Sequence, residues 1–328
     1  MTAQSPARNP SQNSARSPVQ SPAQGAAQSP AQNPAWSSRS LGSKWQHQFF
    51  YVCIRFGGWR LAYAALAVVA FFYTLYPSVR ARSAPYLARR FPLAGKWGMF
   101  LHAFRLYFTF GKTLVDRAAV GITGQGRPEA DPLDTPRMER LLDKEQGLMV
   151  ITAHAGSWQW ALSTLSFTGR RLNILYRRDA EDVDRQYFEH SAGHERPRMI
   201  DSESDFGGVI EVVAALRAGE VVCVTGDRVL GNAKNTVRVS LLGADISMPL
   251  GPFAIAAKVG TPVSVIFTPR SGPCRAKIVI ARIFEETRNM DPALMAEGFA
   301  AALAEFIQRE PYQFFNFYDL WAQARNKK

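Results

Sequence analysis

Acidic residues are missing from the first third of the chain, since no Asp or Glu precedes Asp116 in a sequence of 328 residues. The same stretch holds 13 of the 39 Lys and Arg residues, which leaves 26 basic against 27 acidic residues in the remainder. Nucleic-acid-binding proteins usually spread basic side chains over the folded domain, so this distribution argues against a nucleic-acid partner. An anionic membrane surface fits it better, because each basic residue near such a surface contributes about 1 kcal/mol to binding.

Cysteine is also scarce. Cys53, Cys223 and Cys274 are the only three, and they are too few and too scattered for a disulfide framework or a zinc site. The pair His190 and His194 lies at helical spacing, but Gly193 falls between them and no third ligand is evident. We therefore predict neither a metal nor a cofactor.

Large apolar residues are nearly absent from residues 1–43, which consist mainly of Ser, Pro, Gln and Ala. Such a segment cannot offset its ordering entropy, so we predict a disordered tail. The character then changes, because Leu61 to Val79 is uncharged and just long enough to cross a bilayer. We predict an N-terminal membrane helix there, with a buried core helix as the alternative. A second apolar helix is predicted over Trp97 to Leu114.

The remaining sequence alternates between short continuous apolar runs, which are typical of buried strands, and apolar residues at helical spacing. Helices separated by short buried strands predict an α/β fold, with a central mostly parallel or mixed sheet flanked by helices. Asp205 is predicted to cap one helix, and Asp291-Pro292 to open the last. The predicted strands are 148–153, 172–176, 221–225, 237–242, 262–268 and 276–283, and the predicted helices are 158–167, 180–190, 206–218, 252–259 and 292–309.

These patterns predict three regions along the chain. Residues 1–43 form the disordered tail, residues 44–117 a membrane-associated helical region, and residues 118–328 a catalytic domain. Basic residues flank the predicted membrane helix on both sides, and the heavier flank follows it. The positive-inside rule then favours a cytoplasmic position for the catalytic domain.

His154 is the strongest candidate for a catalytic residue. The apolar run Leu148 to Ala153 leads to it, and the small residues Ala155-Gly156-Ser157 follow. A buried strand that ends in this way places an imidazole at the carboxyl end of the sheet, where open α/β folds keep their active sites. With an ordinary pKa of about 6.5, an imidazole suits the removal of a proton from a hydroxyl group.

His154 begins the segment His-Ala-Gly-Ser-Trp-Gln, which ends at Gln159. The segment resembles the His-x4-acid box of the lysophospholipid acyltransferase superfamily, in particular its branch of lipid A late acyltransferases. Further blocks follow in the order and spacing typical of that branch, and the resemblance covers about residues 50–321. These blocks are Tyr176-Arg177-Arg178, Gly226-Asp227-Arg228, Val237-Arg238-Val239 and Pro249-Leu250-Gly251-Pro252.

The resemblance implies a glycerolipid acyltransferase-like fold in which His154 is the general base. Gln159 then stands where the family has the acid that orients the imidazole. Three alternatives follow from this amide: a weaker or differently tuned activity, an acid supplied from elsewhere, or a protein that no longer catalyses. Asp227 and Asp179 are the candidates for a replacement acid.

By the same resemblance, the chain is a membrane-bound O-acyltransferase. It would move a fatty acyl chain from acyl carrier protein or coenzyme A to a hydroxyl of a glycolipid, such as a lipid A precursor, at the cytoplasmic side of the bacterial inner membrane. The alternatives are a catalytically impaired lipid-binding protein on the same fold and a thioester hydrolase. Cationic side chains and a free helix N-terminus suit phosphate groups. The candidate substrate-binding residues are Trp158, Arg177, Arg228, Arg238 and Gly251.

Overall fold

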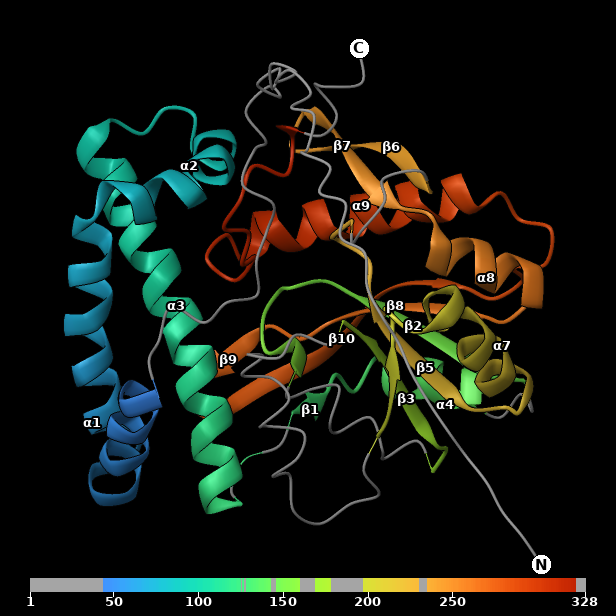
Figure 1. Cartoon of the computed structure of the whole chain (residues 1–328), viewed down its shortest axis with the longest axis horizontal. Helices are drawn as coiled ribbons and strands as arrows, with labels where there is room; N and C mark the ends of the chain where they lie inside the picture. The colour runs from blue at the N-terminus through green and yellow to red at the C-terminus, as the bar shows by residue number, and fades with distance from the viewer. Residues whose placement is uncertain are drawn as a thin grey trace, which may run out of the picture. The chain divides into compact units, whose positions relative to one another are not determined.

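Figure 1 shows the computed structural model of the chain. It describes residues 44–124, 126, 128–142, 146–159, 169–177, 197–229 and 235–322. The predicted tail (residues 1–43), the predicted helix 180–190 and most of the predicted helix 158–167 lie outside these residues.

Three helices form the N-terminal part of the described chain: α1 (Lys44–Leu75), α2 (Pro77–Arg90) and α3 (Lys96–Thr123). The predicted apolar stretch 61–79 divides at Tyr76, because Pro77 suits the first position of a new helix. Among the described residues one helical stretch, Gln48–Leu75, is long and apolar enough to cross a membrane. α1 packs along α3, so much of one side of this helix is covered by protein.

The centre of the fold is an eight-stranded sheet in the order β1-β10-β8-β2-β5-β3-β4, with β9 paired to β10. From β8 to β4 all neighbours are parallel, and β10 is antiparallel to β8. The predicted mostly parallel or mixed sheet is therefore confirmed. The strands are β1 (Glu129–Ala130), β2 (Leu148–Thr152), β3 (Leu172–Tyr176), β4 (Arg198–Asp201), β5 (Val221–Thr225), β8 (Val263–Phe267), β9 (Arg270–Gly272) and β10 (Arg275–Phe284).

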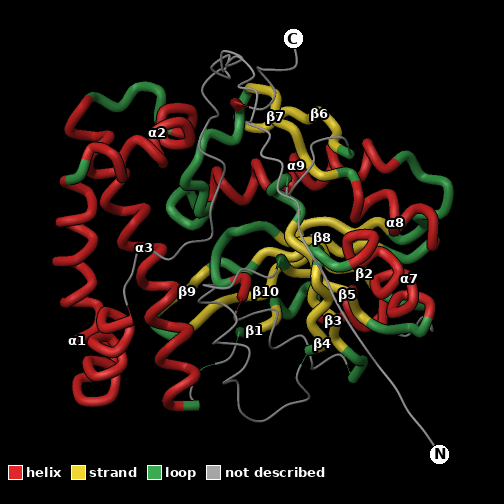
Figure 2. Tube along the Cα trace, viewed as in Figure 1, coloured by secondary structure: helices red, strands yellow, loops and turns green. Residues whose placement is uncertain are grey.

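Helices flank this sheet, as Figure 2 shows. α7 (Val209–Arg217) packs on β5 and β3, while α9 (Pro292–Arg309) packs on β8 and β10. α8 (Gly251–Val259) lies between α7 and α9, and α4 (Thr135–Leu142) precedes β2. Strands β2 and β8 are buried along their whole length, which explains why their sequences are continuous apolar runs.

The helix predicted from residue 206 begins later in the structure. A 3-10 turn, Asp205–Gly208, comes first, and Phe206, Gly207 and Gly208 all have positive φ angles. α7 therefore starts at Val209 with Gly208 at its N-cap, and the prediction that Asp205 caps it is wrong. Gly208 is suited to this position because glycine adopts the left-handed conformation without steric cost.

A separate hairpin packs on α9. Its strands are β6 (Thr236–Leu241) and β7 (Ala244–Pro249), and Leu242 and Gly243 form the turn, both with positive φ angles. The indole nitrogen of Trp321 donates a hydrogen bond to the carbonyl of Leu241 at 3.1 Å. The C-terminal segment thereby fixes the position of the hairpin. The sequence predicted β6 but not β7.

The N-cap of α9 offers a direct test of a local sequence signal. The carboxylate of Asp291 accepts a hydrogen bond from the amide of Ala293 at 2.9 Å, as predicted from Asp291-Pro292. We expect Asp291→Ala to lower the free energy of unfolding by about 1 kcal/mol. Thermal or denaturant unfolding measures this change, and Asp245→Ala, at an exposed position of β7, is the control. Equal stability of the two variants would contradict the capping role.

Candidate active site

The turn that presents His154 is fixed by backbone hydrogen bonds from two other segments. The backbone carbonyl of His154 accepts a hydrogen bond from the amide of Phe315 at 2.9 Å. The amide of Gly156 donates to the backbone carbonyl of Gln313 at 2.7 Å. The amide of Ser157 donates to the carbonyl of Thr268 at 2.8 Å. The sheet and the C-terminal segment thus hold the turn from both sides.

The register of two neighbouring strands brings an acid to the imidazole. β2 and β5 are parallel, and Thr152 lies opposite Thr225. Two residues further along each strand come His154 and Asp227. The Nδ1 atom of His154 lies 2.8 and 3.1 Å from the two carboxylate oxygens of Asp227. The structure therefore forms a His-Asp pair at the carboxyl edge of the sheet.

The environment of Asp227 keeps its carboxylate charged. Burial alone would raise the pKa of Asp227, but the charge and hydrogen bonds of His154, together with the cation of Arg228, hold this pKa below its ordinary value. When the imidazole is neutral, the carboxylate accepts the Nδ1 hydrogen and Nε2 is the basic nitrogen. The side chain of His154 is 18% exposed, so solvent reaches the ring from one side.

Gln159 has a different partner from the imidazole. Its side-chain oxygen accepts a hydrogen bond from the guanidinium of Arg117 in α3. Both side chains are buried. Of the three alternatives for the missing acid, this arrangement favours an acid supplied from elsewhere, because Asp227 occupies the position beside Nδ1. Asp179, the other candidate, lies outside the described residues.

Two of the predicted substrate-binding residues lie beside the His-Asp pair. The ring of Trp158 lies 5.3 Å from that of His154 and also contacts Phe315, so Trp158 forms a wall of the site. Arg228 lies 3.8 Å from the carboxylate of Asp227 and donates to the carbonyl of Phe315 at 3.0 Å. Arg228 therefore links the acid to the segment that holds the His154 turn.

The other three predicted residues lie elsewhere in the described part of the chain. Arg177 follows β3 and pairs with Glu203 at 2.8 Å. Arg238 is exposed on β6, opposite Ser247 of β7. Gly251 begins α8 and lines a cavity. Their role in binding stays a prediction.

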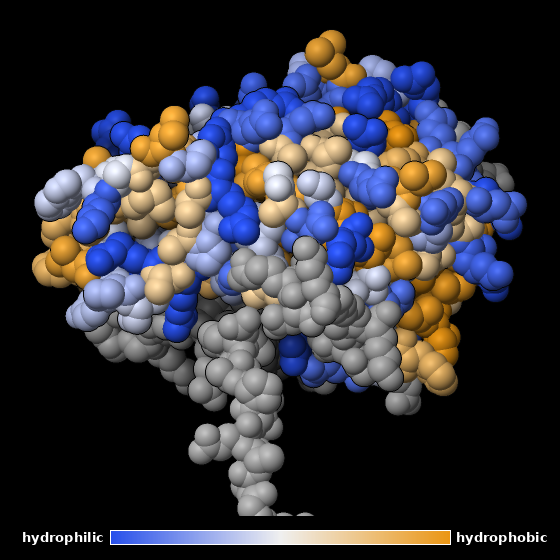
Figure 3. Space-filling model, turned by 90° about the horizontal axis from the view of Figure 1, so that it is seen from above, coloured by the Kyte–Doolittle hydropathy of each residue, from blue (hydrophilic) through white to orange (hydrophobic). Residues whose placement is uncertain are grey.

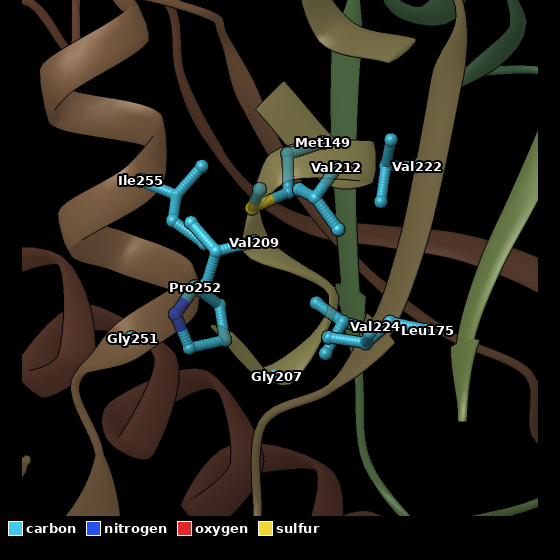
Figure 4. A pocket seen from close by; sticks show the side chains of 10 residues that line it. All are labelled: Met149, Leu175, Gly207, Val209, Val212, Val222, Val224, Gly251, Pro252 and Ile255. Atoms are coloured by element: carbon cyan, nitrogen blue, oxygen red, sulfur yellow. The ribbon is translucent and has the colours of Figure 1, made fainter. Parts of the chain in front are cut away.

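The cavity at Gly251 lies between the sheet and helices α7 and α8 (Figure 4). Its volume is about 130 Å³, and its lining is almost wholly apolar, with Val222 and Val224 of β5, Val212 of α7 and Ile255 of α8. In other proteins an apolar cavity of this size holds a molecule like benzene. The space therefore suits a short apolar group and not a charged headgroup.

Arg117 is the main residue of this region that the sequence did not predict. It follows Asp116 within the mainly apolar helix α3, and both side chains are buried. Buried charges are rare unless they are paired, so an Asp-Arg pair inside an apolar helix was the available signal. The predicted helix ended at Leu114, before these two residues, and the contact with Gln159 joins residues far apart in the chain.

Gly156 gives a test of how tightly the turn is built. Its φ angle is +59°, and a Cβ atom there would lie 2.1 Å from the carbonyl oxygen of Thr268. We expect Gly156→Ala to destabilise the fold by several kcal/mol, because both the backbone angle and the contact oppose a side chain. Unfolding by denaturant measures the loss. Gly243→Ala is the control, since φ there is +74° but the surroundings are open. Similar stability in both variants would contradict the close approach.

Comparison with protein families agrees with this geometry. The model of the bacterial lipid A biosynthesis acyltransferases matches residues 127–323, which is more than half of the chain. The match includes His154, Gln159 and Asp227 and begins after the helices α1 to α3. No curated protein matches the chain. With this match over the α/β domain and its His-Asp pair, the chain belongs to the family of bacterial lipid A biosynthesis acyltransferases.

Proposed function

We propose that this protein is a membrane-bound O-acyltransferase that acts on a lipid A precursor or a related glycolipid. The donor is the thioester of a fatty acid with acyl carrier protein or coenzyme A, and the acceptor is a lipid hydroxyl. The observation that supports this proposal is the contact between Nδ1 of His154 and the carboxylate of Asp227 at 2.8 Å, in a chain of this family.

The proposed chemistry follows from that contact. Asp227 holds the imidazole with its Nδ1 hydrogen toward the carboxylate, so that Nε2 of His154 accepts the proton of the acceptor hydroxyl. The hydroxyl oxygen attacks the thioester carbonyl and forms a tetrahedral intermediate. Its collapse breaks the carbon–sulfur bond, and the thiolate takes the proton back from His154. The products are an ester and a free thiol, and Asp227 stabilises the transient imidazolium.

We further propose that the protein works at the cytoplasmic side of the inner membrane, where both acyl donors are made. Residues 118–328 would carry the catalytic domain, and residues 44–117 would attach it to the membrane. α3 continues to Thr123, beyond the proposed boundary, and Arg117 on it contacts Gln159. The attachment region is then also part of the wall around the catalytic residues.

The proposal predicts that both members of the pair are needed. We expect His154→Ala to lower the rate of acyl transfer at least 10²-fold. Asp227→Asn should lower it by about 10³- to 10⁴-fold, because an amide no longer fixes the tautomer or balances the imidazolium charge. The measurement is transfer of a labelled acyl group from acyl carrier protein to extracted lipid. Asp245→Asn, at an exposed position of β7, is the control.

Two results would contradict the assignment. Transfer by His154→Ala at the rate of the wild type would exclude the imidazole as base. Glycolipid binding without turnover, unchanged in both variants, would identify a lipid-binding protein on the same fold. Analysis of products with and without lipid separates acyl transfer from thioester hydrolysis, since only the hydrolase releases free fatty acid at its full rate without an acceptor.

Gln159 gives an independent prediction. In Gln159→Glu the new carboxylate keeps an acceptor for Arg117 and adds a charge opposite the guanidinium. We expect activity equal to or higher than that of the wild type in the same assay. A tenfold or larger fall, in a variant that unfolds at the same temperature as the wild type, would mean that the amide itself is needed.

A further inference from the structure

Helices α1 to α3 expose an unusually apolar surface. Six large side chains illustrate it, with exposed fractions between 53% and 83%: Phe56, Val68, Phe72, Tyr76, Trp97 and Leu101. We call this surface the outer face. Figure 3 shows apolar side chains among hydrophilic ones at the end of the molecule where α1 to α3 lie. An extended apolar surface on a monomer marks a site of interaction with a protein or a membrane.

The opposite side of α1 is covered by α3. Ala62, Leu66 and Ala70 recur at every fourth position of α1 and are buried, and Leu66 packs beside Gly111 of α3. A Cβ atom at Gly111 would lie 2.4 Å from the side chain of Leu66, so glycine permits this close approach. α1 is therefore half of a packed helix pair and not an isolated helix.

Both ends of the apolar part of α1 are bonded to the rest of the structure. Near its start, the hydroxyl of Tyr63 donates to Asp116 of α3 and accepts from Arg270 of β9 at 2.5 Å. Arg270 also donates to Asp116 at 2.6 Å. This partly buried group of three side chains joins α1 to the edge of the sheet.

After the end of α1, further bonds do the same. Arg80 of α2 donates to the carbonyl of Thr74, and Tyr107 of α3 donates to that of Val79 at 2.6 Å. Tyr86 of α2 donates to the carbonyl of Pro311, beyond α9. A helix tied at both ends to the same folded body runs alongside it and does not lead away from it across a bilayer.

The length of the helix agrees with this placement. Gly58 has φ 62° and ψ −166°, so α1 is interrupted there and continues unbroken only from Trp59 to Leu75. At 1.5 Å per residue this part rises roughly 25 Å, which is at the lower limit for a helix that spans the ~30 Å hydrocarbon core of a bilayer. Arg60 at its start shortens the uncharged part further.

Charge indicates what covers the outer face. Arg55, Arg60, Arg80, Arg82 and Lys96 lie on or between these helices, and no acidic residue precedes Asp116. Apolar side chains bordered by basic ones match the acyl chains and anionic headgroups of one leaflet. A bilayer with anionic lipids supplies both an apolar interior and negatively charged headgroups. A protein partner would need an apolar surface bordered by acidic side chains.

We infer that α1 does not cross the membrane but lies with α3 in the plane of one leaflet. The outer face enters the acyl region, and the basic residues contact anionic headgroups. The inference refines the membrane attachment in the proposed function and rests on it for the choice of a bilayer. Arg117 of α3 contacts Gln159, so the helices placed in the leaflet are directly bonded to the segment that begins at His154.

The first experiment asks on which side of the membrane the two ends of α1 lie. Single cysteines are placed at exposed positions before and after the apolar part, Gln48→Cys and Ala84→Cys, in the full chain with its three native cysteines replaced by alanine. A membrane-impermeant maleimide is added to spheroplasts and to lysed membranes. Equal labelling of both positions in each preparation is expected. Labelling of the two positions from opposite sides would overturn the inference.

The second experiment tests the outer face with matched variants. Phe72 is 56% exposed on α1 and Ile210 is 61% exposed on α7. We expect Phe72→Asp to reduce binding to vesicles with anionic lipid about tenfold or more, and Ile210→Asp to leave it unchanged. Flotation of the purified full-length protein with vesicles measures binding. Equal effects of the two variants, or none, would overturn the inference.

A second copy of the chain is the other possible occupant of the outer face. If Phe72→Asp dissociates an oligomer while vesicle binding stays unchanged, the outer face is a contact between copies and the inference is wrong. None of these readouts depends on turnover. Failure of acyl transfer and failure of the in-plane placement are therefore separate results.

Discussion

The parallel pairing of β2 with β5 fixes where chemistry can occur in this protein. Its register sets Thr152 opposite Thr225, and the two chains then leave the sheet together with a histidine on one and an aspartate on the other. Neither residue needs a long or flexible loop to reach its partner. Backbone hydrogen bonds from the turn to Thr268 and Gln313 fix the position of the turn that carries His154. The pair is therefore positioned before any substrate arrives.

Gln159 and Asp227 have different partners in the structure. An acid five positions after the histidine would serve both the imidazole and any cation beside it. Here Asp227 contacts the imidazole, and the neutral Gln159 contacts the buried guanidinium of Arg117. Since Arg117 belongs to α3, the motif position has become a link between the catalytic domain and the N-terminal helices. The amide oxygen serves as the acceptor for this guanidinium, a role that a carboxylate could also fill.

Much of the fold follows from local patterns in the sequence. Continuous apolar runs predicted β2, β3, β5 and β8, and Asp291-Pro292 predicted the start of α9. The shift at α7 arose because Gly207 and Gly208 take left-handed angles that a hydrophobic pattern does not reveal. β7 was not predicted, because its sequence is not a continuous apolar run like those of the buried strands.

The site was predictable to the same degree. His154 and Asp227 were identified because each follows an apolar strand, but which acid met the imidazole depended on strand order. The contacts of Arg117 and Arg228 join segments that are distant in the chain, and no local pattern encodes them.

The contacts of Gln313 bear on how the protein is extracted with detergent. Its amide exchanges hydrogen bonds with the backbone of Arg270, while its own carbonyl accepts from Gly156 beside the catalytic histidine. Arg270 in turn holds Tyr63 of α1. A detergent that competes for the apolar side of α1 therefore acts on a chain of contacts that ends at the imidazole. Extraction conditions that disturb α1 are thus expected to affect the turn of His154 through Gln313.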